Sequence, residues 1–465
     1  MTAQTILPAN TLSSGGYDVA NSVRMETNTY LTGSDKVTAT SNKIGSFSFW
    51  IKRSGLGANA GGIIKVYDDA NTGSYIGFKD DNTFFVEETN AGGTAIVNLI
   101  TNAVYRDMSA WYHILVTFKT DDGTDSNRVK LYINGTQPSL GTATYPNENT
   151  NLLILGSANP KHEVGVNAGG ASGKHYLAQL LHVDGTALSN TDVGEFDEDS
   201  GIWKPIDISE TTLGNNGYYL SMEDSSNFGV ATGKAMTAHG FAATDSRTDT
   251  CTNNFATLNA LATGLDATLS EGNLKMVSGT ATTRSGTAST IGLTAGKWFA
   301  EFKITGSANG IVGIAGTTQN KSATDDDDIG NYPGRTQQGY GYLSGGSVYN
   351  DSSAVTGSFA TFTTDDIIGV AVDLDGDLLY FYKNGAIQNS GTGIDISGIT
   401  PHSGSWFFAV GDGSAGTAST VECNFGNPIT ALSSAVADGK GFGSFEFTPK
   451  SGHLALCTKN LGSNG

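Results

Sequence analysis

Residues 365–385 read DDIIGVAVDLDGDLLYFYKNG, and this stretch decides the fold of the second half of the chain. Apolar residues alternate through 366–374 and 378–383, which predicts two β-strands, because successive strand side chains point to opposite faces. An acidic turn separates the two strands, and Asn384-Gly385 follows the second. Asn-Gly is the strongest short-range signal for a tight turn between strands. The stretch therefore predicts an antiparallel strand pair.

The same alternation continues on both sides of this pair. In Gly45–Arg53 (GSFSFWIKR) it places Phe47, Phe49 and Ile51 on one face and Trp50 on the other. In the first half, further strands are expected at 63–66, 75–78, 83–87, 96–100, 111–119, 128–133, 151–156 and 175–183. In the second half they are expected at 271–276, 296–304, 311–314, 339–343, 406–410 and 420–425. Strands this frequent, with little helical periodicity, predict an all-β protein of two antiparallel jelly-roll sandwiches.

Breaks in the strand series predict the domain organisation. Residues 1–24 are polar and turn-rich, which favours an arm or tether rather than a domain. The predicted order continues with a jelly roll at 25–205, an irregular connector at 206–268, a second sandwich at 269–428 and a tail at 429–465. Sixty-two glycines fit this scheme, because glycine adopts the positive φ of tight turns without steric cost.

Charge and cysteine content exclude several classes of partner. The formal net charge is −19, from 45 acidic and 26 basic residues, which disfavours nucleic acid and anionic membranes. The three cysteines form no CxxC pair, so a zinc ribbon is excluded. The odd count favours free thiols and assembly in a reducing cytoplasm. The start MTAQTILPANTLSSGG has no signal-peptide pattern, and no apolar run is long enough to span a membrane.

Enzymatic and calcium-loop motifs are incomplete. A jelly-roll glycanase needs a carboxylate pair arranged as E-x-D-x-x-E, but 195–200 reads EFDEDS and ends in Ser200. Asp373 begins a stretch resembling an EF-hand loop, but Leu378 and Asn384 stand where Gly and Glu are required. His113 lies in an apolar strand and is expected to be a packed core residue rather than a base. We therefore expect no enzymatic activity and no organic cofactor.

Two kinds of binding site remain candidates. A run of acids is the first candidate for a calcium site, since calcium prefers dense oxygen ligands. It comprises Asp325, Asp326, Asp327 and Asp328. A second set, Asp68, Asp69, Asp80 and Asp81, is a weaker candidate for calcium.

Aromatic and polar side chains around one loop are the candidate ligand-binding residues, because an aromatic ring can stack on a ligand while its hydroxyl forms a hydrogen bond. They are Tyr332, Arg335, Tyr340, Tyr342 and Tyr349. Alternatively, Tyr340 and Tyr342 pack one sheet face.

The first strand series resembles a laminin-G or concanavalin A-like jelly roll. The residues that carry the resemblance are FSFWIKR (47–53), WYHILVTF (111–118), VKLYINGT (129–136) and YLAQLLHVDGTAL (176–188). The resemblance covers about 180 residues and implies a fold shared by lectins, adhesion modules and some glycanases. Because unrelated activities share it, the fold alone does not set the function.

The second series resembles a SPRY domain, which implies a protein-interaction module with ligand contacts in loops at one end. The residues that carry it are GKWFAEFKI (296–304), the glycine-rich 313–316, YGYL (340–343), 365–385 and VECNFGN (421–427). Segments at the joints resemble phage structural proteins in which a jelly roll precedes a SPRY-like domain. They are GIWKPI (201–206), LGNNGYYLSMEDSS (213–226), NNFATLNAL (253–261), LSEGNLKM (269–276) and SGHLALCTKNL (451–461).

These resemblances imply a bacteriophage virion protein on the exterior of the particle, at the tail or capsid surface. The expected function is that of a tail fibre or receptor-binding component that recognises host surface glycan or protein. Two alternatives stay open, namely a decoration or fibre protein that binds other virion proteins and, less favoured, a glycan depolymerase. We expect a homo-oligomer, for which a trimer is one option, without nucleic-acid binding or membrane insertion.

Overall fold

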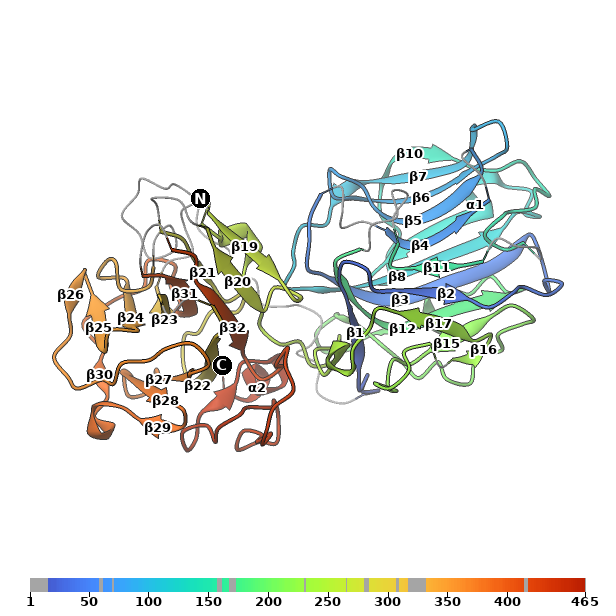
Figure 1. Ribbon diagram of the computed structural model, residues 1–465. Helices are drawn as coiled ribbons and strands as arrows, with labels where there is room; N and C mark the ends of the chain where they lie inside the picture. Colours follow the sequence, from blue (N-terminus) through green and yellow to red (C-terminus); the bar gives the residue numbers. More distant parts are fainter. Residues whose placement is uncertain are drawn as a thin grey trace. The chain divides into compact units, whose positions relative to one another are not determined.

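A computed structural model describes residues 16–57, 62–68, 71–156, 161–166, 173–229, 231–264, 266–279, 284–306, 309–316, 332–413 and 417–464. The chain divides into two compact units (Figure 1). We call Ser13–Thr252 the N-terminal unit and Asn253–Gly465 the C-terminal unit. Both units are built from antiparallel sheets, which confirms the predicted all-β class.

The N-terminal unit contains two sheets, each of eight strands as counted over the described residues. Sheet 1 has the order β16 (Thr232–Gly233), β15 (Tyr218–Leu220), β12 (His175–Asp184), β3 (Ile44–Arg53), β8 (Trp111–Lys119) and β9 (Val129–Ile133). It also includes β1 (Ser22–Met25), which pairs with β12 and with β18 (Ser246–Arg247). Sheet 2 has the order β10 (Leu140–Thr144), β7 (Ala95–Val104), β6 (Thr83–Thr89), β5 (Gly73–Phe78), β4 (Gly62–Tyr67), β11 (Glu163–Val164), β2 (Tyr30–Gly33) and β17 (Met236–His239).

The core of this unit lies between sheets 1 and 2. Phe47, Phe49 and Ile51 of β3 point into it and are fully buried, as their alternation predicted. Trp50 lies on the opposite face of β3, yet it too is buried, in a second apolar cluster with Trp203. Sheet 1 is therefore covered on both faces.

A buried ion pair fixes part of the layer that covers the outer face of sheet 1. Lys52 Nζ lies 2.7 Å from Asp249 Oδ2, and neither side chain is exposed. The indole Nε1 of Trp111 donates a second hydrogen bond to this carboxylate, 3.1 Å from Oδ1. Breaking such a pair leaves an uncompensated buried charge, at a cost of about 3–5 kcal/mol. The pair therefore anchors the chain near residue 249 to the centre of the sheet.

Several segments differ from their predicted structure. Within 206–268, the expected connector, the chain contributes β15, β16, β17 and β18 to the sheets of the N-terminal unit. Residues 22–24 of the expected arm belong to the buried strand β1. Residues 151–156, expected as a strand, form a turn. The N–H groups of Leu153 and Ile154 donate to the Glu88 carboxylate, at 2.7 Å and 3.2 Å, instead of to a neighbouring strand.

The two Asn-Gly pairs make the same turn but lead to different strands. Asn134 and Gly135 both have positive φ (48° and 75°), as a tight two-residue turn requires. After that turn only Thr136 pairs back with Ile133 of β9, and the chain then crosses to β10 of sheet 2. Asn384 and Gly385 (φ 47° and 78°) instead join β28 (Leu378–Lys383) to β29 (Ala386–Ile387) as a hairpin.

The C-terminal unit contains two more sheets. Sheet 3 has the order β19 (Ala267–Ser270), β20 (Lys275–Ser278), β32 (Thr420–Asn424), β22 (Lys297–Ile304), β27 (Ile367–Asp373), β28 and β29, with β30 (Ile394–Asp395) beside β28 and β33 (Leu454–Ala455) beside β22. Sheet 4 has the order β21 (Gly286–Ala288), β31 (Phe407–Asp412), β23 (Gly310–Ala315), β24 (Gly339–Leu343), β25 (Ser347–Asn350) and β26 (Ser353–Ala354). The predicted pair from 365–385 is β27 and β28, joined by an acidic turn.

Smaller elements complete both units. The described residues also contain the strand pair β13 (Glu195–Phe196) and β14 (Trp203–Lys204), and the helices α1 (Asp125–Arg128) and α2 (Thr458–Asn464). Single 3-10 turns lie at Asn190–Asp192, Ala243–Asp245, Ala260–Ala262 and Asn389–Gly391. The strand expected at 271–276 is mostly the turn between β19 and β20, where Glu271 and Asn273 have positive φ. No helix in the described part of the chain is long and apolar enough to cross a membrane.

The C-terminal segment 426–456 packs on the outer face of sheet 3. Glu301 of β22 binds it, because its carboxylate accepts the backbone N–H groups of Glu446 and Phe447, each at 2.8 Å. Asn424 Nδ2 donates a third hydrogen bond at 3.2 Å. Burial raises the pKa of Glu301 to about 7, although these hydrogen bonds oppose the shift. This carboxyl group therefore holds the segment in place.

We expect Glu301→Gln to loosen the C-terminal segment. Glutamine offers one acceptor oxygen, and its NH2 group would face a backbone N–H donor, so about 1–3 kcal/mol of local stability should be lost. Amide hydrogen exchange of residues 444–447 measures this directly. Glu446→Gln is the control, because its carboxylate accepts only the N–H of Ser433 among the described residues. Equal protection of these amides from exchange in the two variants would contradict the role of Glu301 in holding the segment.

Four buried histidines make the stability of the N-terminal unit depend on pH. They are His113, His162, His175 and His182. Burial lowers the pKa of His113 to about 3 and that of His182 to about 4. Because the unfolded chain binds these protons more tightly, stability is complete above about pH 6.5 and is lost as the pH falls towards 4.

Each such histidine should contribute a slope of up to about 1.4 kcal/mol per pH unit below pH 6.5. His113→Gln cannot take up the proton, so its free energy of unfolding should fall less steeply between pH 6.5 and 4. Urea unfolding at several pH values measures both slopes. Identical slopes for the variant and the parent protein would show that His113 is not held neutral by the fold.

Candidate functional site

A row of polar and aromatic side chains crosses the outer face of sheet 2. In order across the strands, the paired residues are Thr237, Thr32, Glu163, Lys65, Tyr75, Glu87, Asn98 and Thr144. Residues paired directly across antiparallel strands share one face of the sheet. Ile64 and Val66, on either side of Lys65, point into the core, so the row points away from it. We call this row the outer row of sheet 2.

Tyr75 lies at the centre of the outer row with its ring against the backbone of Gly73. A Cβ atom at Gly73 would come within 2.7–2.9 Å of the Tyr75 ring, so only glycine leaves room for this position. Tyr67 is the cross-strand partner of Gly73 and is 44% exposed. Burial, and then the neighbouring Tyr67 and Glu87, raise the pKa of the Tyr75 hydroxyl. The two rings and the carboxylate are therefore close neighbours.

Charged groups flank these rings. Lys65 Nζ lies 3.4 Å from Glu163 Oε2 and 5.0 Å from the centre of the Tyr67 ring. The outer row thus combines aromatic faces with carboxylate, ammonium, amide and hydroxyl groups. Sugars need this combination, because their C–H faces stack on rings while their hydroxyls form hydrogen bonds. Sequence patterns predicted four of the eight strands that carry the row, namely β4, β5, β6 and β7. The other four strands, and the order and register that assemble the row, were not predicted.

The loop residues predicted to bind a ligand separate into two groups. Tyr340 and Tyr342 belong to the hydrophobic core, where Tyr342 has no exposure and its hydroxyl donates to the Ala360 carbonyl. Their rings are therefore unavailable to a ligand. Both rings pack on the core face of sheet 4, which was the alternative considered for them. Tyr332 is also buried, with its ring centre 4.8 Å from the guanidinium of Arg284.

Arg335 and Tyr349 remain partly exposed. Arg335 Nη1 donates to the hydroxyl of Ser352 at 2.9 Å. Ser352 donates back to the Arg335 carbonyl at 2.7 Å, which fixes this loop locally. These two residues stay candidates for a contact with a partner.

The calcium candidates receive little support. Asp325, Asp326, Asp327 and Asp328 lie outside the described residues, as does Asp69. Asp81 Oδ1 accepts the N–H and the hydroxyl of Thr83, at 2.9 Å and 2.6 Å, as in an ordinary turn. Among the described residues, no three potential metal ligands of the His, Cys, Asp and Glu types come together.

The acidic segment considered for glycoside hydrolysis forms the small hairpin β13–β14. Lys204 Nζ lies 3.2 Å from Glu195 and 3.4 Å from Asp197, so one lysine pairs with both carboxylates. Hydrogen bonds from the backbone and hydroxyl of Ser200 lower the pKa of Asp197 to about 2. A general acid needs a raised pKa and a second carboxylate across a cleft. The pKa of Asp197 is shifted in the opposite direction, and its charged neighbour here is a lysine.

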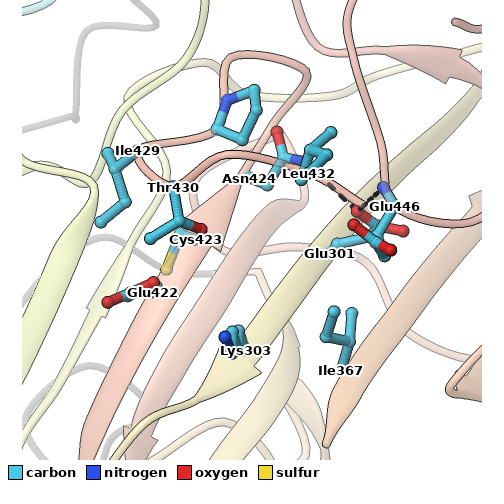
Figure 2. A pocket seen from close by; sticks show the side chains of 11 residues that line it. Glu301, Lys303, Ile367, Glu422, Cys423, Asn424, Ile429, Thr430, Leu432 and Glu446 are labelled. Carbon is cyan, nitrogen blue, oxygen red and sulfur yellow. Dashed lines mark hydrogen bonds between the residues drawn. The ribbon is translucent and has the colours of Figure 1, made fainter. Parts of the chain in front are cut away.

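A pocket of about 330 Å³ opens on the outer face of sheet 3 (Figure 2). Its floor is formed by Lys303 of β22, Ile367 of β27 and Glu422 of β32. The segment that follows β32 forms the opposite wall with Ile429 and Leu432. Figure 2 shows charged groups and aliphatic side chains facing the same space.

Comparisons with known proteins agree with this architecture. The family model described as "Concanavalin A-like lectin/glucanases superfamily" matches residues 25–170, and the "SPRY domain" model matches residues 286–418. No curated protein matches the chain.

Parts of the chain are also similar to solved structures. The SPRY domain of human HERC1 shares 16% identity, with 36% of this chain and 96% of that chain covered and a TM-score of 0.28. A heptameric SAP-like pentraxin from Limulus polyphemus shares 16% identity, with 38% and 81% covered and a TM-score of 0.28. The TRIM65 PSpry domain shares 13% identity, with 37% and 89% covered and a TM-score of 0.28. The chain therefore contains a concanavalin A-like, laminin-G-type domain followed by a SPRY domain.

Proposed function

We propose that this protein is a non-enzymatic binding protein on the exterior of a bacteriophage virion, and that it recognises host surface glycan. The outer row of sheet 2 carries the proposal. Its rings, carboxylates, amide and ammonium lie on one sheet face and point away from the core. The virion assignment rests on the resemblance of the joint segments to phage structural proteins. A tail fibre or receptor-binding component fits both features.

The excess of acidic residues is compatible with a neutral or amine-bearing glycan and disfavours a strongly anionic one. Recognition of a glycan does not depend on net charge, because hydrogen bonds and stacking supply the contacts. A host surface protein is the other form of receptor, and Arg335 and Tyr349 of the SPRY domain are the candidate contacts for it.

A decoration or fibre protein that binds other virion proteins is the second candidate. The SPRY domain favours it, since its fold implies a protein-interaction module. The two functions differ in what they require of the particle: a decoration protein needs lattice contacts but no affinity for the host. A homo-oligomer, such as a trimer, is compatible with either.

Replacing the central ring should weaken glycan binding. We expect Tyr75→Ala to lower the affinity of the full chain for purified host surface polysaccharide by about 2- to 10-fold, because stacking on one ring contributes about 0.5–1.5 kcal/mol. Biolayer interferometry on immobilised polysaccharide measures the change. Phe196→Ala is the control, since this ring is 48% exposed but lies on β13, outside sheet 2. Equal effects of both variants would sink the proposed surface.

The absence of catalysis has its own test. The purified protein should leave the viscosity of host polysaccharide unchanged over hours, because Glu195 and Asp197 are paired with Lys204 rather than facing each other across a cleft. A fall in viscosity that disappears in Glu195→Gln would instead favour a depolymerase.

A further inference from the structure

The pocket on the outer face of sheet 3 places Glu422 and Lys303 next to each other without an ion pair between them. Glu422 lies between Lys275 and Lys303 in the strand register, with one lysine on each neighbouring strand. Its Oε1 lies 3.7 Å from Lys275 Nζ. Lys303 does not approach Glu422 closely enough to form an ion pair, although the two residues are directly paired on β22 and β32.

The second oxygen of Glu422 is the unusual group. Oε2 is buried and has no hydrogen-bond partner within the described part of the chain, and the side chain is 13% exposed. A buried carboxylate oxygen without a donor costs about 1–3 kcal/mol or more. A ligand that brings an N–H donor to this oxygen would recover that cost.

Lys303 supplies the complementary charge. In the described residues its ammonium has no hydrogen bond or ion pair, and it faces the pocket between Glu422 and Glu301 (Figure 2). Glu301 forms no ion pair with it among the described residues, and both of its oxygens accept N–H groups of the C-terminal segment. Three carboxylates line the pocket, and of their oxygens only Oε2 of Glu422 is buried without a donor in the described residues. Lys303 is the only cation among the described residues of the lining.

Aliphatic side chains form much of the remaining lining. Ile367 lies on the floor, and Ile429 and Leu432 lie on the wall. The space of about 330 Å³ includes open solvent, so the enclosed part of the pocket is smaller and admits only a small ligand or part of one. Such a ligand needs a cation and an anion close together and a short apolar body.

We propose that this pocket binds a small zwitterion with an aliphatic body, such as an aliphatic α-amino acid. Its ammonium group pairs with Oε2 of Glu422 and its carboxylate pairs with Nζ of Lys303. Its side chain packs against Ile367, Ile429 and Leu432. The site is separate from the outer row of sheet 2 and does not depend on glycan recognition.

Isothermal titration calorimetry of the full chain with L-leucine tests the proposal. Two half-probes share the same aliphatic body: isoamylamine lacks the carboxylate, and 4-methylpentanoate lacks the ammonium. We expect leucine to bind and each half-probe to bind about tenfold or more weakly, because each loses one charge pair. Failure of leucine to bind at millimolar concentration, or equal binding of isoamylamine, would overturn the proposal.

Matched variants assign each charge. Glu422→Gln should weaken leucine about tenfold while leaving 4-methylpentanoate unchanged, and Lys303→Met should weaken leucine while leaving isoamylamine unchanged. Lys275→Met removes the present partner of Glu422 and should leave leucine binding equal or tighter. If Glu422→Gln does not fold, leucine binding by Lys303→Met still tests the proposal. Lys303 makes no hydrogen bond or ion pair within the described residues, so its replacement should not disturb the fold. Leucine binding that neither variant changes would place the ligand elsewhere and refute the site.

Discussion

Coverage of sheet 1 on both faces is the constraint on which the N-terminal unit depends. All ten residues of β12, and nine of ten in β3, are buried. The inner face packs in the sandwich core, and the outer face packs beneath chain segments that include Trp203 and Cys251. A charge buried beneath such a layer needs an oppositely charged partner. Lys52 Nζ and Asp249 Oδ2 form this ion pair at 2.7 Å. The two central strands of sheet 1, β3 and β12, are therefore structural and leave almost no surface for a ligand.

This constraint leaves the outer face of sheet 2 as the surface that we propose for recognition. Its inner residues close the same core, and its outer row points away from that core, with Tyr75, Glu87 and Asn98 partly exposed. The C-terminal unit follows a related rule, because the segment after β32 covers the outer face of sheet 3 and Glu301 holds it there. The covering is incomplete next to Glu422 and leaves a pocket. In both units, the proposed binding site lies where the outer face of a sheet is not fully covered by other segments of the chain.

Local patterns predicted the fold class and the facing of single strands well. Alternation identified the faces of β3, and Asn-Gly identified both tight turns, because these signals depend on neighbouring residues. Long-range pairings could not be predicted in this way. The Asn134-Gly135 turn leads to another sheet, and the segment expected as a connector fills sheet positions, because partners far away in sequence decided both. Of the candidate site residues, Tyr340 and Tyr342 alternate as expected, but the face they share is the core.

The central claim is that the N-terminal unit binds the host from the exterior of the particle. Antibodies raised against residues 13–252 test it most directly, through adsorption of intact phage particles to host cells together with electron microscopy of the labelled particles. Our account predicts label on the tail or capsid surface and blocked adsorption, with Fab fragments acting as well as whole antibody. Surface label with normal adsorption would contradict host binding and leave a decoration protein. Particles without any label would contradict the exterior location.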